Sequence, residues 1–108
     1  MTLTELESKL SLKRLTSGGN DREIASCYIS DLLSRVLGGC QPGDVWITVQ
    51  ISINMVAVAV MVDAGCVILP EDLTAPANVI EKADEEDLVI FTSSETAYTL
   101  AKKIAQMI

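Results

Sequence analysis

The chain has 108 residues, of which 49% are hydrophobic, and this is enough for one hydrophobic core but not for two. Fifteen acidic residues stand against eight basic ones, and the net charge of −7 disfavours nucleic acid and anionic membrane surfaces as partners. Histidine is absent, which excludes catalysis by serine–histidine or cysteine–histidine pairs.

The first residues, MTLTELESKLSL, predict a short amphipathic helix. Leucines recur at helical spacing, and Thr2 or Thr4 can begin the helix. Thr4 with Glu7 also fits the S/T-x-x-E capping box. Acidic residues stand where a signal peptide needs a basic start and an apolar run, so we expect a cytoplasmic protein.

Two short strands and a helix are expected next. LKRLT is a strand candidate, SGGND is a turn, and EIASCYI alternates as a strand with one buried face would. Ser30 or Asp31 can cap the helix that follows, and Gly38–Gly39 would stop it.

The segment from Val45 to Leu69 predicts a strand, a helix and a second strand. VWITVQI and CVIL have strand composition. NMVAVAVMVDAG alternates like a strand, but two parallel strands need a crossover of about a dozen residues, which it can supply as a helix. The run 45–62 just reaches the length of a membrane span, but its polar residues favour two buried elements.

The last third of the chain predicts a polar helix, the strand EEDLVIFT and a closing helix, SSETAYTLAKKIAQMI. Thr92 and Glu95 fit another capping box. Strands and helices alternate from residue 22 onward, which is typical of parallel sheets. We therefore expect one α/β domain over residues 1–108, with three α/β/α layers, a mainly parallel sheet of four to five strands, and helices on both faces.

Several stretches together resemble the DRTGG domain family over essentially the whole chain. They are DREIASCYISDLLS, GDVWITVQISINMVAVAV, CVIL and LVIFTSSETAYTLAKKI. Asp21 and Arg22 stand where the name motif begins, whereas Glu23 and the following ASC replace its threonine and glycines. The resemblance implies an α/β domain related to the N-terminal domain of HPr kinase/phosphorylase. It also implies a regulatory or dimerising module, as in phosphotransacetylases and in pyrophosphatases that carry CBS domains.

On this basis we expect a non-enzymatic regulatory or small-ligand-sensing module that acts beside a metabolic enzyme. The alternative is a scaffold or subunit-docking protein with no small-molecule ligand. A kinase activity is disfavoured because the chain lacks the phosphate-binding sequence G-x-x-x-x-G-K-[ST]. We expect neither a cofactor nor a metal, and a nucleotide or a small polar metabolite is the candidate ligand.

The hydropathy of the chain bears on assembly. A mean hydropathy of +0.36 in so small a domain suggests more apolar surface than one core can bury. A symmetric homodimer is the usual way to cover such a surface.

The candidate ligand-binding residues form two groups. The first is Asp21, Arg22, Tyr28, Ser30 and Asp31, and the second is Thr48, Gln50, Asn54, Thr92 and Ser93. Arg22 can bind a carboxylate or phosphate, or can pair with a nearby acid while Asp21 caps a turn. The second group follows strands of the expected sheet, and ligands of open parallel sheets bind beyond the carboxyl ends of the strands. A capped helix start at Ser52 or Asn54 explains part of that group equally well.

Overall fold

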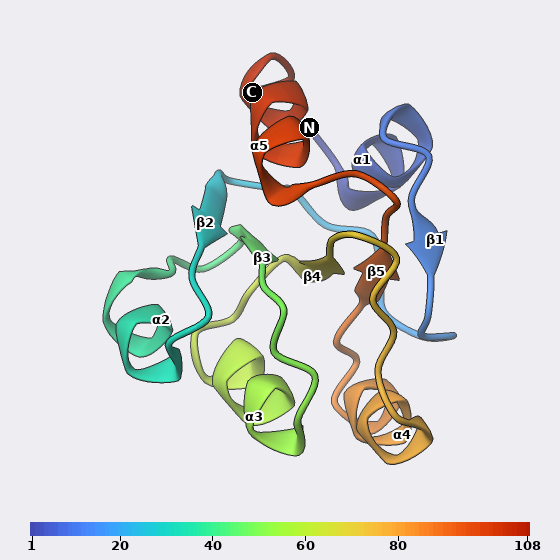
Figure 1. Cartoon of the computed structure of the whole chain (residues 1–108), viewed down its shortest axis with the longest axis vertical. Helices are drawn as coiled ribbons and strands as arrows, with labels where there is room; N and C mark the ends of the chain where they lie inside the picture. The colour runs from blue at the N-terminus through green and yellow to red at the C-terminus, as the bar shows by residue number, and fades with distance from the viewer.

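A five-stranded sheet lies between two layers of helices in the computed structural model, which describes residues 1–108 (Figure 1). One face is covered by α1 (Leu3–Lys9) and α5 (Ala97–Ala105), and the other by α2 (Leu33–Gly39), α3 (Ile53–Met61) and α4 (Ala77–Glu85). This arrangement confirms the predicted three-layer α/β/α fold. None of the helices combines the length and the apolar composition needed to cross a membrane.

Four of the five strands run parallel. The strands are β1 (Lys13–Arg14), β2 (Cys27–Ile29), β3 (Val45–Ile47), β4 (Cys66–Leu69) and β5 (Ile90–Thr92). Their order is β1-β5-β4-β3-β2, and only β1 pairs with its neighbour in the antiparallel sense. The carboxyl ends of β2 to β5 therefore share one edge of the sheet, and their amino ends share the other.

The three central strands are buried on both faces, which explains their continuous apolar sequences. Trp46, Val67 and Ile90 pack against the layer formed by α2, α3 and α4. Their neighbours Ile68 and Phe91 pack against α1 and α5. The alternation of side chains along each strand thus divides the core into two clusters, one on each side of the sheet.

The ambiguous segment between β3 and β4 is a helix, as the crossover argument predicts. Ser52 is the N-cap of this helix, and its side chain accepts a hydrogen bond from the Met55 amide. The strand that follows this helix is β4, with the sequence CVIL, which begins at Cys66 and pairs in parallel with β3. The crossover between two parallel strands therefore decided the structure, although the sequence alternates.

The two predicted capping boxes, Thr4 with Glu7 and Thr92 with Glu95, are wrong in position, whereas Thr2, the other predicted start of the first helix, is confirmed as its N-cap. Thr2, not Thr4, caps α1, and its box is completed by Glu5. Thr96 caps α5 through the Thr99 amide, because Thr92 belongs to β5. The pattern of threonine and glutamate therefore predicted correctly that the first and last helices are capped, but it placed both capping boxes on other residues.

The corner between β2 and α2 also differs from the prediction. Leu32 is the N-cap residue of α2, and it forms no side-chain cap. The Ser30 hydroxyl accepts a hydrogen bond from the Leu32 amide, whereas Asp31 binds the neighbouring connection after β3. The helix includes both glycines and ends at Gly39.

Strand β2 is shorter than predicted, because residues 24–26 do not pair regularly with β3. The Ile24 amide donates to the carbonyl of Met1, and the Ala25 amide donates to the carbonyl of Gly43. Only Cys27 to Ile29 run in register with β3. The segment before β2 is therefore held partly by α1 and partly by the sheet.

Candidate functional site

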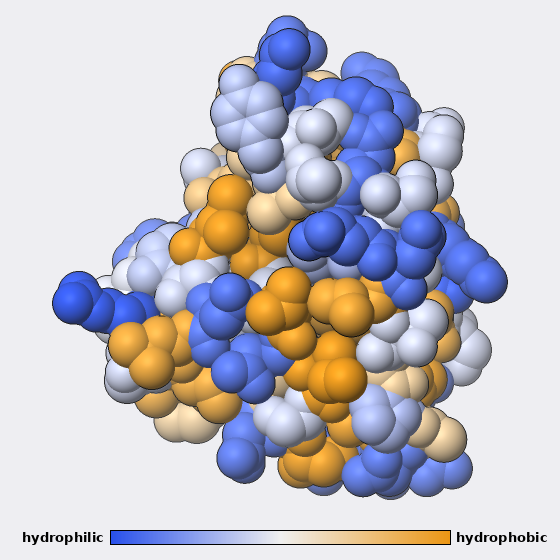
Figure 2. All heavy atoms as spheres, in the orientation of Figure 1, coloured by the Kyte–Doolittle hydropathy of each residue, from blue (hydrophilic) through white to orange (hydrophobic).

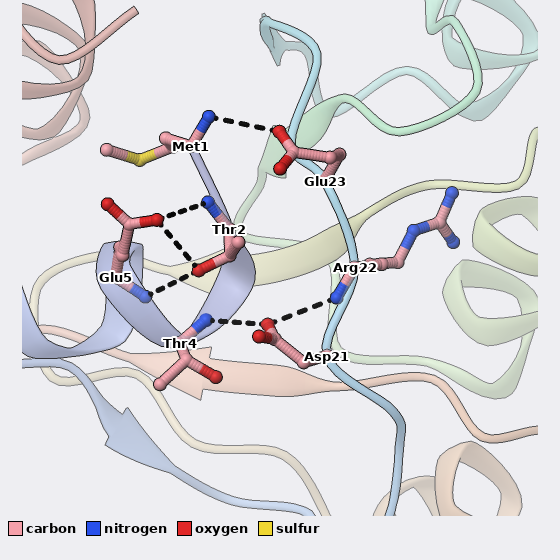
Figure 3. A network of polar contacts seen from close by, with 7 residues as sticks. All are labelled: Met1, Thr2, Thr4, Glu5, Asp21, Arg22 and Glu23. Carbon is pink, nitrogen blue, oxygen red and sulfur yellow. Dashed lines mark hydrogen bonds and ion pairs between the residues drawn. The ribbon is translucent and has the colours of Figure 1, made fainter.

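Asp21 is used to hold the start of α1 (Figure 3). Its Oδ1 accepts hydrogen bonds from the backbone amides of Thr4 at 3.0 Å and Arg22 at 3.1 Å. The Thr4 amide in particular lowers the pKa of Asp21. The alternative in which Asp21 acts as a cap is therefore the one that the geometry favours, although the capped element is a helix.

The side chain of Arg22 points away from this network (Figure 3). Its Nη1 and Nη2 donate to the two carboxylate oxygens of Asp63, at 3.0 and 3.3 Å. Asp63 directly follows α3 and its C-cap residue, and has a left-handed backbone with φ 55°. The carboxylate that Arg22 binds in this structure is thus one from the protein itself.

Arg22 and Asp63 form part of a cleft of about 490 Å³ at the amino ends of β4 and β5. Its polar lining comprises Asn20, Arg22, Asp63, Glu86 and Asp87. Its apolar lining comprises Ala59, Val60, Ala64 and Leu88. The cleft volume lies within the range of small-molecule sites. We refer to it as the Arg22 cleft.

The Arg22 cleft is electronegative. The carboxyl-terminal ends of α3 and α4 both lie at it, and a helix carries partial negative charge at that end. Three carboxylates line it against one guanidinium group. Lys82 compensates part of this charge, because its Nζ lies 3.3 Å from Glu86, and the contact raises the pKa of Lys82. The field favours cations and hydrogen-bond donors over phosphate groups.

The loop 17–20 reaches the cleft through Asn20 and is held by Asp84 of α4. The Oδ1 atom of Asp84 accepts hydrogen bonds from the Ser17 amide at 2.9 Å and the Gly18 amide at 3.0 Å. A side chain at Gly19 would be strained, because its Cβ would lie 2.4 Å from a methyl group of Val89 and the backbone φ is +94°. The two amides lower the pKa of Asp84.

This lowered pKa predicts a pH-dependent stability. The folded-state pKa of Asp84 lies below its ordinary value of 3.8, so the stability that this carboxylate contributes is present above pH 3.8 and is lost as the pH falls through the folded-state pKa. Because the carboxylate is exposed to solvent, we expect Asp84→Asn to lower the free energy of unfolding by only about 1 kcal/mol at neutral pH. Urea denaturation at neutral pH and at pH well below 3.8 measures the difference, which should disappear in acid.

The matched variant Glu81→Gln removes an exposed carboxylate that forms no hydrogen bonds from the same helix, and it should show no such difference. An equal loss for Asp84→Asn at both pH values would contradict the assignment.

At the carboxyl edge, Thr48 and Gln50 of the second predicted group lie together with Asp31, which was predicted in the first group. The Thr48 hydroxyl and the Val49 amide both donate to Asp31 Oδ1 at 2.9 Å. The Gln50 side chain donates to the Asp31 carbonyl at 2.8 Å. These groups tie the connections after β2 and β3 to each other, so their hydrogen-bonding capacity is largely used within the protein.

Of the other polar candidates at this edge, Thr92 and Ser93 form hydrogen bonds within the protein, and Asn54 lies exposed. Thr92 is buried, and its hydroxyl donates to the Leu73 carbonyl at 2.6 Å. Ser93 is buried, and its hydroxyl accepts from the Glu95 amide. Strand β4 separates this pair from Thr48. Asn54 is exposed on the first turn of α3.

Tyr28 points to α2. Its hydroxyl donates to the Arg35 carbonyl at 3.1 Å, and a Cβ added at Gly39 would lie 2.4 Å from the same hydroxyl. A glycine at position 39 therefore lets the tyrosine ring lie across the end of α2. In this structure the tyrosine links an edge strand to a helix.

Sequence reasoning missed Asp63, Glu86 and Asp87 as site residues. The acidic run from Glu81 to Leu88 supplies a wall of the cleft through its last residues, Glu86 and Asp87 among them. The available signal was that VDAG and EEDL each place an aspartate just after a helix, at positions that adopt φ 55° and 57°. Nothing in their spacing indicates that the two helix ends meet Arg22.

The three cysteines do not supply a reactive thiolate. Burial raises the pKa of Cys27 and of Cys40 to about 11. Burial also raises the pKa of Cys66, which is fully enclosed in β4. Nucleophilic thiol chemistry at neutral pH is therefore disfavoured.

No protein-family model matches this chain, and no curated protein matches it. Its fold is similar to a solved structure of the CBS and DRTGG domains from the regulatory region of Clostridium perfringens pyrophosphatase, complexed with the activator diadenosine tetraphosphate. The TM-score is 0.73 at 15% sequence identity. The match covers 98% of this chain and 46% of that one, so this chain spans less than half the length of its structural relative. The similarity confirms the DRTGG-like resemblance at the level of the fold.

Proposed function

We propose that this chain is a regulatory module that binds a small polar metabolite in the Arg22 cleft. The observation that carries the proposal is the shared fold with part of a regulatory region solved with an activator. The Arg22 cleft supplies a place for a ligand, because it has a volume of about 490 Å³ and combines a guanidinium group with several carboxylates. We place the module in the cytoplasm, as a homodimer beside a metabolic enzyme whose activity it modulates.

The charges of the cleft favour a cationic or zwitterionic ligand. A free polyphosphate would face Asp63, Glu86 and Asp87, and like charges at short range are unfavourable. A ligand carboxylate can replace Asp63 on the planar fork of Arg22. An ammonium group on the same ligand can then bind the released carboxylate and its acidic neighbours. An amino acid or a related aminated metabolite has this combination of groups.

Replacement of Asp63 by a ligand at the Arg22 side chain could also transmit ligand binding to other parts of the structure. The Arg22 carbonyl accepts a hydrogen bond from the Leu3 amide at the start of α1, while its side chain reaches Asp63 after α3. Arg22 therefore contacts both helical layers. A ligand that displaces Asp63 would change how the end of α3 is held relative to α1.

A thermal-shift screen against aminated metabolites, amino acids and nucleotides tests the proposal. A ligand at a hundred times its dissociation constant should raise the melting temperature by on the order of 10 °C. Arg22→Ala should abolish this shift of the melting temperature, because it removes the guanidinium group that binds the ligand carboxylate. The matched variant Gln50→Ala removes a polar side chain at the carboxyl edge and should keep it.

Two outcomes of the screen would contradict the Arg22 cleft. A shift that Gln50→Ala abolishes and Arg22→Ala keeps would place the ligand at the carboxyl edge. If no compound shifts the melting temperature while a pull-down finds a stable partner protein, the alternative of a scaffold without a ligand replaces the sensing module. The exposed apolar side chains of the chain are the observation that keeps this alternative open.

A further inference from the structure

The exposed apolar side chains are concentrated on one part of the molecule. Eight of the ten large hydrophobic residues that remain exposed lie between positions 29 and 61. They are Ile29, Leu32, Leu37, Val49, Ile51, Ile53, Val60 and Met61. We call these eight residues the α2–α3 surface, and Figure 2 shows apolar residues gathered over this region of the molecule. Each residue retains between 36% and 72% of its surface, and together they expose several hundred Å², a patch of the size that marks interaction sites.

Helix α3 at the centre of this surface is apolar on all sides apart from Asn54, which is exposed on its first turn. No charged residue occurs from Val45 to Val62. Met55, Val56, Val58 and Ala59 face the core, whereas Ile53, Ala57, Val60 and Met61 remain exposed. A helix that is apolar all round is normally covered all round. Helices α2 and α4 flank α3 and the sheet lies beneath it, so only the outward side lacks a partner.

The distribution of charge indicates what covers this side. Between residues 29 and 61 the charged residues are Asp31, Arg35 and Asp44. Asp44 is buried, so the exposed charges are those of Arg35 and of Asp31, whose carboxylate also accepts hydrogen bonds from the connection after β3, and these two charges are opposite in sign. Two copies with a net charge of −7 each repel one another over most of their surface. The α2–α3 surface is where that repulsion is weakest.

We infer that the α2–α3 surface is the contact between two copies of this chain, with the α3 helices packed against each other across a two-fold axis. The inference rests on the homodimer of the proposed function and assigns it a surface. Ala57 in the middle of the exposed side lets the two helices approach closely.

The charges beside α3 favour one orientation of the two copies. Arg35 is exposed on α2, on one side of α3, and Glu81 and Glu85 are exposed on α4, on the other side. A two-fold axis along α3 sets Arg35 of each copy opposite the α4 carboxylates of the other. An axis across α3 would instead set the α4 carboxylates of the two copies against each other.

Sedimentation velocity of the purified chain at micromolar concentration tests the assignment. We expect a dimer for the unsubstituted chain and a monomer for Ala57→Glu, which places two carboxylates at the axis. Met61→Glu changes the most exposed residue of the surface and should also give a monomer if Ala57→Glu fails to fold. The matched control Tyr98→Glu, on the opposite layer, should remain a dimer. An unsubstituted monomer, or a dimer that only Tyr98→Glu disrupts, would overturn the inference.

Cross-linking tests the orientation. With the axis along α3, Met61→Cys chains should form a disulfide-linked dimer on oxidation that the unsubstituted chain does not form. Links that form only between Ile53→Cys and Met61→Cys chains would overturn the axis along α3. The ligand test is separate, because Arg22→Ala should remove the thermal shift and leave the dimer intact. A dimer without any ligand response would contradict the sensing function alone.

Discussion

Replacing Trp46 with alanine should lower the free energy of unfolding by about 3–5 kcal/mol, the largest loss that we expect from one substitution in this chain. The indole is completely buried in β3 and packs in the core cluster beneath α2, α3 and α4. Its Nε1 donates to the Ser30 carbonyl at 2.9 Å. The substitution therefore leaves a cavity and removes a hydrogen bond at the same time. Urea denaturation followed by far-UV circular dichroism measures the loss.

The variant Trp46→Phe separates the two contributions. Phenylalanine keeps most of the ring packing but leaves the Ser30 carbonyl without its donor, so we expect a loss of about 1–3 kcal/mol. Equal losses for the two variants would mean that packing of the indole contributes little. The hydrogen bond joins the corner after β2 to the middle of β3, so the tryptophan of the WIT sequence has a structural role.

The fold could be predicted from the sequence because its signals are local and agree with one another. The runs VWI and CVIL are apolar throughout, and IFT is apolar except for its last residue, as is typical of strands buried on both faces. The alternating segment 53–61 was the exception, and the length needed for a parallel crossover decided it correctly. Periodicity alone would have given an additional strand in place of α3.

Helix starts could not be placed as well, because the sequence TLTELE contains two overlapping capping boxes. Thr2 with Glu5 and Thr4 with Glu7 satisfy the same pattern. The first is used because the Thr4 amide is taken by Asp21, which lies seventeen residues away in the sequence. A contact between distant residues thus chooses between two equivalent local signals, and no short window of sequence contains it.

The candidate site was predictable only in part. Arg22 was identified from its motif, and in the structure it lines a cleft of about 490 Å³. The carboxylates around it come from two helix ends that are adjacent only because β4 and β5 are neighbours in the sheet. Position along the chain carries no sign of this proximity. The ligand-binding site was predicted at the carboxyl edge because polar residues follow the strands there. In the structure, most of these residues form hydrogen bonds within the protein.

Asp31→Ala should lower the free energy of unfolding by about 2–3 kcal/mol, because it removes a charged acceptor from two donors. The Thr48 hydroxyl is 1% exposed, so water cannot easily replace the lost carboxylate. Urea denaturation at neutral pH measures the effect. Asn54→Ala is the matched control at the same edge, and its exposed amide should change stability by less than about 0.5 kcal/mol.

The sign of the Asp31→Ala effect distinguishes a structural role from a ligand-binding role. Residues kept for binding often cost stability, so that their replacement by alanine is neutral or stabilising. A residue that ties two connections together has the opposite effect. If Asp31→Ala leaves the stability unchanged or raises it, the carboxylate is available to a ligand, and the carboxyl edge is again a candidate ligand-binding site. If the loss is as large as expected, the polar residues after β2 and β3 serve to fix the connections beside the α2–α3 surface, and the Arg22 cleft at the opposite edge is the better candidate for a ligand site.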